Sequence, residues 1–269
     1  MPTTSDLSLE CVGVSKDYNL GETLSLKRTL TALTPGRTVQ ARRFRALDDV
    51  SFEVPRGSFF GIVGTNGSGK STLTQAISGI TVPTSGEIRV WGRVLPLLEV
   101  GAGFHDELTG RENVFLLGAI LGIPMREVKA AVDDIIAFAG VEQHFDTPLK
   151  RYSTGMKARL SFGTAIFFPA DIYVFDEVLA VVDDDFRDQC VVELRRLNAE
   201  SRTIIFMSHD LSLVTAICNT GMWLEKGRVR AVGPMQDVAS QYATSAERAR
   251  AREEEAKARA RAIAGTISA

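Results

Sequence analysis

The residues with the clearest chemistry lie between positions 64 and 72, where the chain reads GTNGSGKST. The spacing of its glycines, lysine and serine fits the pattern G-x-x-x-x-G-K-[ST], which is typical of a phosphate-binding loop. Glycines let the backbone wrap tightly, with its N–H groups pointing inward toward anionic oxygens. The chain is therefore predicted to bind a nucleoside triphosphate through Gly64, Thr65, Asn66, Gly67, Ser68, Gly69, Lys70, Ser71 and Thr72.

The sequence around this loop predicts the elements that would position it. Residues 58–63 (SFFGIV) form a short apolar run of β type, and residues 71–78 (STLTQAIS) indicate the start of a helix. The N-terminus of a helix carries about half a positive charge, which favours bound phosphate. Lys70 is expected to reach the β- and γ-phosphates, and Ser71 is expected to bind Mg²⁺.

Two acids follow a second apolar strand, at IYVFDE. Asp176, at the carboxyl end of this strand, is expected to hold Mg²⁺ through water. Glu177 points elsewhere and is expected to take a proton from the attacking water. His209 follows the strand TIIFMS, and ligands of open α/β sheets bind at such strand ends. From the sequence alone, His209 fits a structural role as well as a nucleotide contact.

The composition of the whole chain limits the class of protein to which it can belong. It has 269 residues, 45% hydrophobic and 24% charged, which is ordinary for a globular protein of one or two domains. A net charge of −2 gives no reason to expect nucleic acid, and no apolar run approaches the roughly 18 residues of a membrane span. The N-terminus has no pattern of a secretory signal. The 3 cysteines are scattered, which suits a reducing, cytoplasmic compartment.

The order of elements predicts an α/β fold. Short β runs are expected at 8–18 and 47–54, and the stretch 84–94 is expected to form a hairpin-like strand pair. Helical periodicity covers about 105–168, which indicates a helical insertion. Strands return at 171–177, 202–210 and 221–233, with a helix at 186–200 between the first two. Strands that alternate with helices favour a mainly parallel sheet covered on both faces.

A basic segment, at about residues 19–46, lies between the first two predicted strands. Leu26, Leu30 and Leu33 fall on one face of a short helix that Pro35 would end. Two interpretations stay open: a solvated insertion, or a basic amphipathic element near anionic lipid headgroups or a membrane partner. Against a single acid, Glu22, the segment has six cationic residues: Lys27, Arg28, Arg37, Arg42, Arg43 and Arg45.

The order GTNGSGKST, YSTGMKARL, IYVFDE, Asp183 and SHD resembles the ATPase subunit of an ABC transporter, from about residue 8 to 240. The resemblance implies a P-loop NTPase (RecA-like) core with an antiparallel β subdomain and an inserted helical subdomain. It implies an ATPase domain at 1–245 and a charged C-terminal helix or tail at 246–269. Two subunits would pair head to tail, with Ser153 and Gly155 touching the γ-phosphate held by the partner. Asp183 would couple the two sites, and His209 would act beside the γ-phosphate.

Departures from the common family pattern narrow the resemblance. The usual signature Leu-Ser-Gly-Gly-Gln is replaced by YSTGM at 152–156, and Glu99 lies nearest the position of a usual glutamine. With DEVLAV, these features resemble the Wzt, KpsT and TagH group, which exports lipid-linked polysaccharides, and more narrowly the mycobacterial galactan exporter ATPases. The resemblance implies ATP and Mg²⁺, a homodimer, a separate Wzm-like membrane permease, no nucleic acid, and a place at the cytoplasmic face of the cell membrane.

Some alternatives stay open. The family places an aromatic ring on adenine, and Tyr18 fits that place, with Phe44 as its rival. The cargo could instead be a drug or small solute. A soluble ABC ATPase of translation or DNA repair is a further alternative, although such proteins usually join two ATPase domains or insert a long coiled coil.

Overall fold

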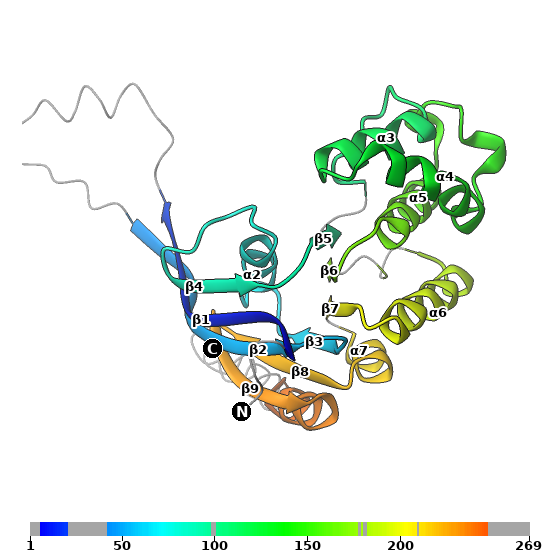
Figure 1. The fold of residues 1–269 in the computed structure, drawn as a ribbon. Helices are drawn as coiled ribbons and strands as arrows, with labels where there is room; N and C mark the ends of the chain where they lie inside the picture. Colours follow the sequence, from blue (N-terminus) through cyan, green and yellow to red (C-terminus); the bar gives the residue numbers. More distant parts are fainter. Residues whose placement is uncertain are drawn as a thin grey trace, which may run out of the picture.

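The computed structural model describes residues 6–20, 42–97, 101–176, 179, 182–208 and 210–246. Two sheets form the body of these residues, and a group of helices stands beside them (Figure 1). An antiparallel sheet has the order β2 (Arg42–Pro55), β1 (Leu7–Leu20), β4 (Ser85–Val90). A six-stranded sheet has the order β5 (Val94–Leu97), β6 (Ile172–Asp176), β7 (Thr203–Met207), β3 (Phe59–Val63), β8 (Thr220–Glu225), β9 (Arg228–Pro234). Neighbouring strands of this second sheet are parallel, except β8 and β9.

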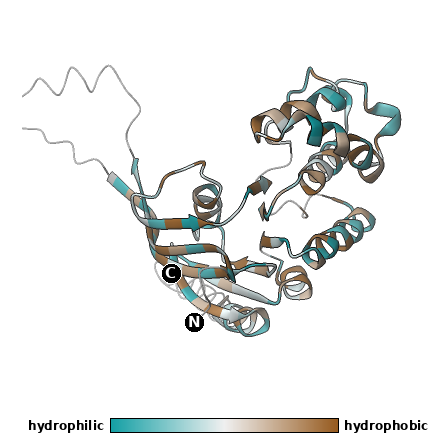
Figure 2. Cartoon of the chain, viewed as in Figure 1, coloured by the Kyte–Doolittle hydropathy of each residue, from teal (hydrophilic) through white to brown (hydrophobic). Residues whose placement is uncertain are grey.

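The helices fall into two groups. Around the large sheet lie α2 (Lys70–Ile77), α6 (Asp184–Ala199), α7 (Leu211–Ile217) and a helix at 235–246. The inserted group consists of α3 (Gly110–Ile120), α4 (Met125–Ala139) and α5 (Thr154–Phe167), with short 3-10 turns at Glu142–His144 and Leu149–Arg151. The helices of this group carry both hydrophobic and hydrophilic residues (Figure 2), as helices with one buried face do.

Side chains of the central strand β3 alternate between two hydrophobic cores. Phe60 and Ile62 pack with α2 and the antiparallel sheet. Phe59 and Val63 pack in the core that also holds the inserted helices. Since every residue of β3 is buried, the strand is covered on both faces, as parallel strands usually are. The predicted fold class is confirmed: a parallel α/β core with an antiparallel β subdomain and inserted helices.

The predicted hairpin at 84–94 is wrong. Its first half, β4, pairs with β1, whereas its second half, β5, pairs with β6 in the other sheet. The intervening Gly92 has a φ of 130°, and a Cβ there would lie 2.5 Å from the Asp171 side chain. This glycine therefore serves a crossover between sheets and a close approach to Asp171, rather than a tight turn within one sheet.

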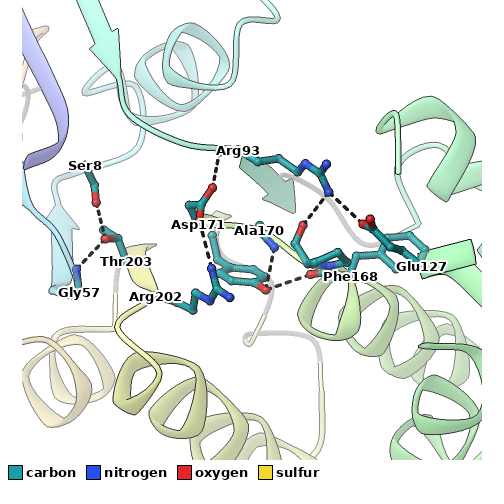
Figure 3. Close-up of polar contacts among 11 residues, drawn as sticks. Ser8, Gly57, Arg93, Glu127, Phe168, Ala170, Asp171, Arg202 and Thr203 are labelled. Carbon is teal, nitrogen blue, oxygen red and sulfur yellow. Dashed lines mark hydrogen bonds and ion pairs between the residues drawn. The ribbon is translucent and has the colours of Figure 1, made fainter. Parts of the chain in front are cut away.

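Asp171 forms hydrogen bonds that connect the N-terminal ends of β5, β6 and β7 (Figure 3). Its carboxylate accepts from the Arg93 backbone N–H at 2.8 Å and from the Arg202 guanidinium at 3.0 Å. The Arg93 guanidinium in turn donates to Glu127 of α4 at 3.3 Å. These polar contacts fix the edge of the sheet opposite to the strand ends where the nucleotide residues lie.

The strands β1 and β2 extend further than the sequence predicts. They pair beyond Tyr18, through Asn19 opposite Arg43 and Leu20 opposite Arg42. Both ends of the predicted basic insertion are therefore strand, and they form a two-stranded ribbon. Residues 21–41, which include Lys27, lie outside the described residues.

Candidate nucleotide-binding site

The loop between β3 and α2 has a backbone path that only glycine allows at two points. Gly69 has a φ of 107°, and a Cβ there would lie 2.7 Å from the Ala46 carbonyl oxygen. At Gly64 a Cβ would lie 2.3 Å from the Leu224 carbonyl oxygen. The loop is closed by the Ser68 N–H, which donates to the Thr65 carbonyl at 3.1 Å. The chain thus forms the tight, inward-turned loop that its glycines predict.

Two features of this loop favour the binding of a ligand: the uncapped start of α2 and the Ser68 hydroxyl. α2 begins at Lys70 with Gly69 as its N-cap, and no side chain caps it. The first N–H groups of a helix have no partners within the helix, so an uncapped start favours an anion. The Ser68 hydroxyl is buried and has no hydrogen-bond partner, which is costly unless a bound group supplies one. The loop therefore fits the oxygens of a phosphate chain.

Lys70 and Ser71 lie at the start of α2 but differ in burial. Lys70 is 6% exposed, and its Nζ donates to the carbonyls of Gly64 at 2.8 Å and Thr65 at 3.3 Å. The ammonium is thereby held against the loop where the phosphates would lie. Ser71 is exposed, so its hydroxyl is accessible to a metal ion or to solvent.

Asp176 lies at the same edge of the sheet as the loop. It ends β6, is 9% exposed, and stands opposite Met207, the last residue of β7. The Thr74 hydroxyl of α2 lies 2.7 Å from the Met207 sulfur. Since β7 alone separates β6 from β3, α2 and the strand ends bring Asp176 to the phosphate-loop edge. A serine hydroxyl and a carboxylate suit Mg²⁺, so Ser71 and Asp176 fit that ion.

Ser153 and Gly155 begin α5. Ser153 is the N-cap, and its Oγ accepts from the Met156 N–H at 3.1 Å. Gly155 is in the first turn, where a Cβ would meet only the Ser153 hydroxyl, at 3.9 Å. Figure 1 shows α5 with the inserted helices, away from α2. The structure therefore does not bring these two residues to the phosphate loop of their own chain.

Asp183 is the N-cap of α6. Its Oδ1 accepts from the Phe186 N–H at 3.0 Å, and its Oδ2 accepts from the Arg159 guanidinium at 2.6 Å. The Arg159 hydrogen bond, and then the bond from Phe186, hold the pKa of this carboxyl below its usual value. Asp183 is consequently an anion that joins α5 to α6.

Tyr18 and Phe44 are directly opposite each other on β1 and β2. Residues paired across antiparallel strands project from the same face, so the two rings are neighbours rather than rival positions far apart. Phe44 is 50% exposed, and the Lys16 ammonium lies 5.2 Å from the Tyr18 ring centroid. Two residues after Phe44, the Ala46 carbonyl borders Gly69. The ring pair is thus near the phosphate loop.

Comparison with known proteins decides the family. The sequence model of the ABC transporter family matches residues 47–180. The O-antigen export system ATP-binding protein RfbB of Klebsiella pneumoniae is 37% identical over 232 residues, which are 85% of this chain and 94% of that protein. The chain belongs to the ABC transporter ATP-binding proteins.

Other similar proteins are also ATP-binding proteins of export systems or ABC transporters. RfbB of Myxococcus xanthus is 38% identical over 82% of this chain, which spans about half (51%) of that relative's length. The teichoic acids export ATP-binding protein TagH of Bacillus cereus is 40% identical over 73% of this chain and 36% of its own length. A solved ATP-binding subunit of an ABC transporter superposes with a TM-score of 0.70 at 23% identity, covering 87% of this chain and 93% of the other. That structural likeness supports the fold.

Three predicted site residues of this ABC protein, Glu99, Glu177 and His209, lie outside the described residues. Their roles stay predictions. Among the helices that the structure does describe, none is both long and apolar enough to cross a membrane.

Hydrogen bonds from outside the phosphate loop support it, and no sequence pattern predicts them. The Gly227 N–H donates to the Ser68 carbonyl at 2.8 Å, and the Asp48 N–H donates to the Gly227 carbonyl at 2.8 Å. Gly227 lies in the β8–β9 turn, and its sequence signal is only that of a turn. The contact of Arg159 with Asp183 is likewise not predicted, because a single arginine in a helix carries no local signal.

Proposed function

We propose that this ABC protein is the ATP-hydrolysing subunit of an exporter for a lipid-linked polysaccharide, working with a separate membrane permease. The observation that carries the proposal is its 37% identity to an O-antigen export ATP-binding protein over 94% of that protein. The described phosphate loop and Asp176, which lie at the same edge of the large sheet, support the proposal.

Hydrolysis on this proposal follows from the residues in order. Loop N–H groups and the Lys70 ammonium bind the β- and γ-phosphates, and Ser71 with Asp176 would hold Mg²⁺. When bound, Mg²⁺ would neutralise charge on the phosphate oxygens. Glu177 takes the proton of the attacking water, and His209 stabilises charge at the γ-phosphate. Glu99 is proposed to replace the glutamine usual in the family.

The second half of each ATP site is proposed to come from a second copy. The start of α5 offers an N-terminus with Ser153 and Gly155, which suits a phosphate. Because α5 stands apart from α2 in one chain (Figure 1), a head-to-tail homodimer would place it over the partner's loop. Binding of ATP would close such a dimer, and hydrolysis would open it.

Adenine is proposed to stack on the ring pair, with Tyr18 as the main contact. We expect Tyr18→Ala to weaken ATP affinity by about 1–3 kcal/mol, the range of base–aromatic stacking. Phe44→Ala should have a smaller effect if Tyr18 carries the stack. Titration with a fluorescent ATP analogue checks both. Equal affinities of Tyr18→Ala and wild type, with weakened Phe44→Ala, would assign the role to Phe44.

Residues 27–45, within the basic segment at 19–46, are proposed to contact lipid headgroups or the lipid-linked substrate. Arg45 is not a clean probe, because it forms ion pairs with Asp17 at 2.8 Å and Asp48 at 3.0 Å, within the ribbon. We therefore expect charge reversal of Arg42 and Arg43 to reduce export, since anionic headgroups attract each nearby cation by about 1 kcal/mol. Export by cells carrying this double variant is the measurement, and undiminished export would remove the proposal.

The cargo and partner are tested together by copurification from native membranes. Tagged protein should bring down a polytopic membrane protein, and lipid-linked glycans should stimulate its ATPase activity. Stimulation by a galactan carrier would support the narrower cargo. A partner that responds to a drug or small solute would change the cargo. Recovery with ribosomes or DNA instead would overturn the transport role and leave the ATP site standing.

A further inference from the structure

Three backbone segments meet beside the phosphate loop, at Ala46 of β2, Gly227 of the β8–β9 turn and Gly69 of the loop itself. A Cβ on Gly227 would lie 2.6 Å from the Ala46 carbonyl oxygen, and a Cβ on Gly69 would lie 2.7 Å from the same atom. The segments are therefore in direct backbone contact, which glycine allows. Since β2 runs from Phe44 to this contact, its direction decides where the ring pair of Tyr18 and Phe44 lies relative to the loop.

Strand pairing does not fix that direction. Among the described residues, β4 pairs with β1 as far as Ser15, so the ring pair lies on a two-stranded ribbon beyond the third strand (Figure 1). The register also shifts between Lys16 and Asp17, which leaves Ala46 as an extra residue of β2. Such a bulge bends the strand that carries it, and a two-stranded ribbon is marginally stable alone. The ribbon therefore needs contacts from outside its own backbone.

Charged side chains connect the ribbon to the phosphate loop. The Arg45 guanidinium donates to the Asp17 carboxylate at 2.8 and 3.2 Å and to the Asp48 carboxylate at 3.0 Å. The second Asp48 oxygen accepts from the Arg228 guanidinium at 2.7 Å. The Asp48 N–H donates to Gly227, whose own N–H donates to the phosphate loop. The four charged side chains form one network, the ribbon network, which ends at the turn that contacts the loop.

A second anchor of the ribbon leads away from the loop. The Lys16 ammonium donates to the Val82 carbonyl at 2.7 Å, and the Asp17 N–H donates to the Thr84 hydroxyl at 3.0 Å. Val82 and Thr84 directly precede β4, so these bonds hold the ribbon to the antiparallel sheet. The ribbon network is the anchor that leads to the phosphate loop.

The ribbon network lies on the face of the ribbon opposite to the rings. Asp17 and Arg45 are opposite each other, one position before Tyr18 and one position after Phe44. Successive residues of a strand point to opposite faces, so the charged groups lie behind the rings rather than beside adenine stacked on them. The two parallel hydrogen bonds from Arg45 to Asp17 fix geometry as well as charge. The network therefore acts on the backbone that carries the rings.

Stability alone does not account for the network. The Arg45 and Arg228 side chains are 55% and 64% exposed, and ion pairs this exposed contribute little to the free energy of unfolding. The hydrogen bond from Arg228, and then that from Arg45, hold the pKa of the Asp48 carboxyl below its usual value, so Asp48 is an anion between two cations. A binding group that is fixed in place before its ligand arrives has a higher affinity, because less order is lost on binding.

We propose that Asp48 and Arg45 are positioning residues that set the place of the ring pair relative to the phosphate loop, and so give the site its preference for a phosphate chain that carries a base. This rests on the proposed function, because the rings matter only where adenine stacks on them. Neither side chain contacts the nucleotide. With the network broken, the loop still binds phosphates, whereas the rings no longer meet the base in one orientation.

The test compares Arg45→Ala and Asp48→Ala with wild type. Asp48→Ala removes the ion pairs and keeps the backbone N–H bond. The matched control is Arg89→Ala, because Arg89 is 45% exposed and pairs with two carboxylates of the same sheet, Glu10 at 2.9 Å and Glu87 at 2.7 Å. Affinities for Mg-ATP and for Mg-tripolyphosphate, which has no base, are measured by displacement of a fluorescent ATP analogue. Each substitution is also made in a ringless background, Tyr18→Ala with Phe44→Ala.

We expect Arg45→Ala and Asp48→Ala to weaken ATP affinity about three- to tenfold, a part of the roughly five- to 150-fold that a base–aromatic stack contributes. Affinity for tripolyphosphate should not change, because the loop is intact. The KM for ATP should rise with little change in kcat, since the lost binding is common to the ground and transition states. In the ringless background neither substitution should weaken ATP further, because both act through the rings.

Four results would each overturn the positioning role: equal weakening of ATP and tripolyphosphate, unchanged ATP affinity, a further loss in the ringless background, or the same loss in Arg89→Ala. If Asp48→Ala does not fold, Arg45→Ala decides, since that side chain is more than half exposed. A ringless protein that binds ATP like wild type overturns stacking and positioning together and leaves the proposed function standing.

Failure of the proposed function gives a different result, in which wild type binds neither ATP nor tripolyphosphate. Hydrogen exchange of residues 16–19 without nucleotide then decides whether the ribbon network holds the ribbon. We expect this exchange to be faster in Arg45→Ala than in wild type and unchanged in Arg89→Ala. Equal exchange in all three proteins would overturn the anchoring on which the positioning role depends.

Discussion

Lys70→Ala is expected to reduce ATP hydrolysis by about two to three orders of magnitude, the cost of losing one group aimed at developing charge in a catalytic site. In the structure the Lys70 ammonium is buried against the Gly64 and Thr65 carbonyls of the loop. Its place is fixed before nucleotide arrives, so little reorganisation is needed when phosphate binds. Alanine leaves the phosphate charge without this partner. Phosphate release from purified protein is the measurement.

The control for Lys70→Ala is Lys129→Ala. Lys129 is exposed on α4, so its removal takes away the same charge without touching the loop. Circular dichroism and thermal unfolding should show that both variants fold, because the hydrogen bonds from the Lys70 ammonium to Gly64 and Thr65 lie within the loop. Activity of Lys70→Ala within about threefold of wild type would remove Lys70 from the mechanism, since a charge group of this kind is worth far more.

The phosphate loop and the strands on either side could be predicted from sequence because their signals are local. Gly64, Gly69, Lys70 and Ser71 stand at fixed spacing, and the buried strands are continuous apolar runs. The structure puts the loop after β3 and Asp176 at the end of β6, as those runs indicate. Local composition decides such elements because each is formed by neighbours in sequence.

Pairing between distant segments could not be predicted in this way. The hairpin at 84–94 fails because a Gly-rich turn looks alike whether the next strand stays in one sheet or crosses to another. From the sequence, Tyr18 and Phe44 are alternatives, because nothing in either strand reveals that the two residues are paired. The contact of Arg159 with Asp183 joins residues 24 positions apart on different helices. In each case the three-dimensional register, which periodicity does not contain, decides the outcome.

Glu177→Gln is expected to abolish hydrolysis while ATP binding persists, which traps the closed dimer. Glutamine has nearly the shape of glutamate but cannot accept the proton of the attacking water, and general-base catalysis contributes about 10²–10⁴-fold. The phosphate loop, Lys70 and Asp176 are untouched by the change. With Mg-ATP, the variant should elute as a species twice the 29.3 kDa of one chain, whereas wild type should return to monomer as ATP is consumed.

Measuring the dimer distinguishes nucleotide binding from general-base catalysis. A turnover assay does not, because loss of either one stops hydrolysis. Lys70→Ala and Glu177→Gln should therefore differ in assembly although both are inactive: the first weakens the bound phosphates, and the second preserves them. Glu142→Gln, an exposed acid beyond α4, is the matched control and should turn over ATP and dissociate like wild type. Unchanged turnover in Glu177→Gln would remove it as the base. An inactive but monomeric Glu177→Gln with ATP bound would keep the base and remove the head-to-tail dimer, since the start of α5 would then have no partner's phosphate to bind.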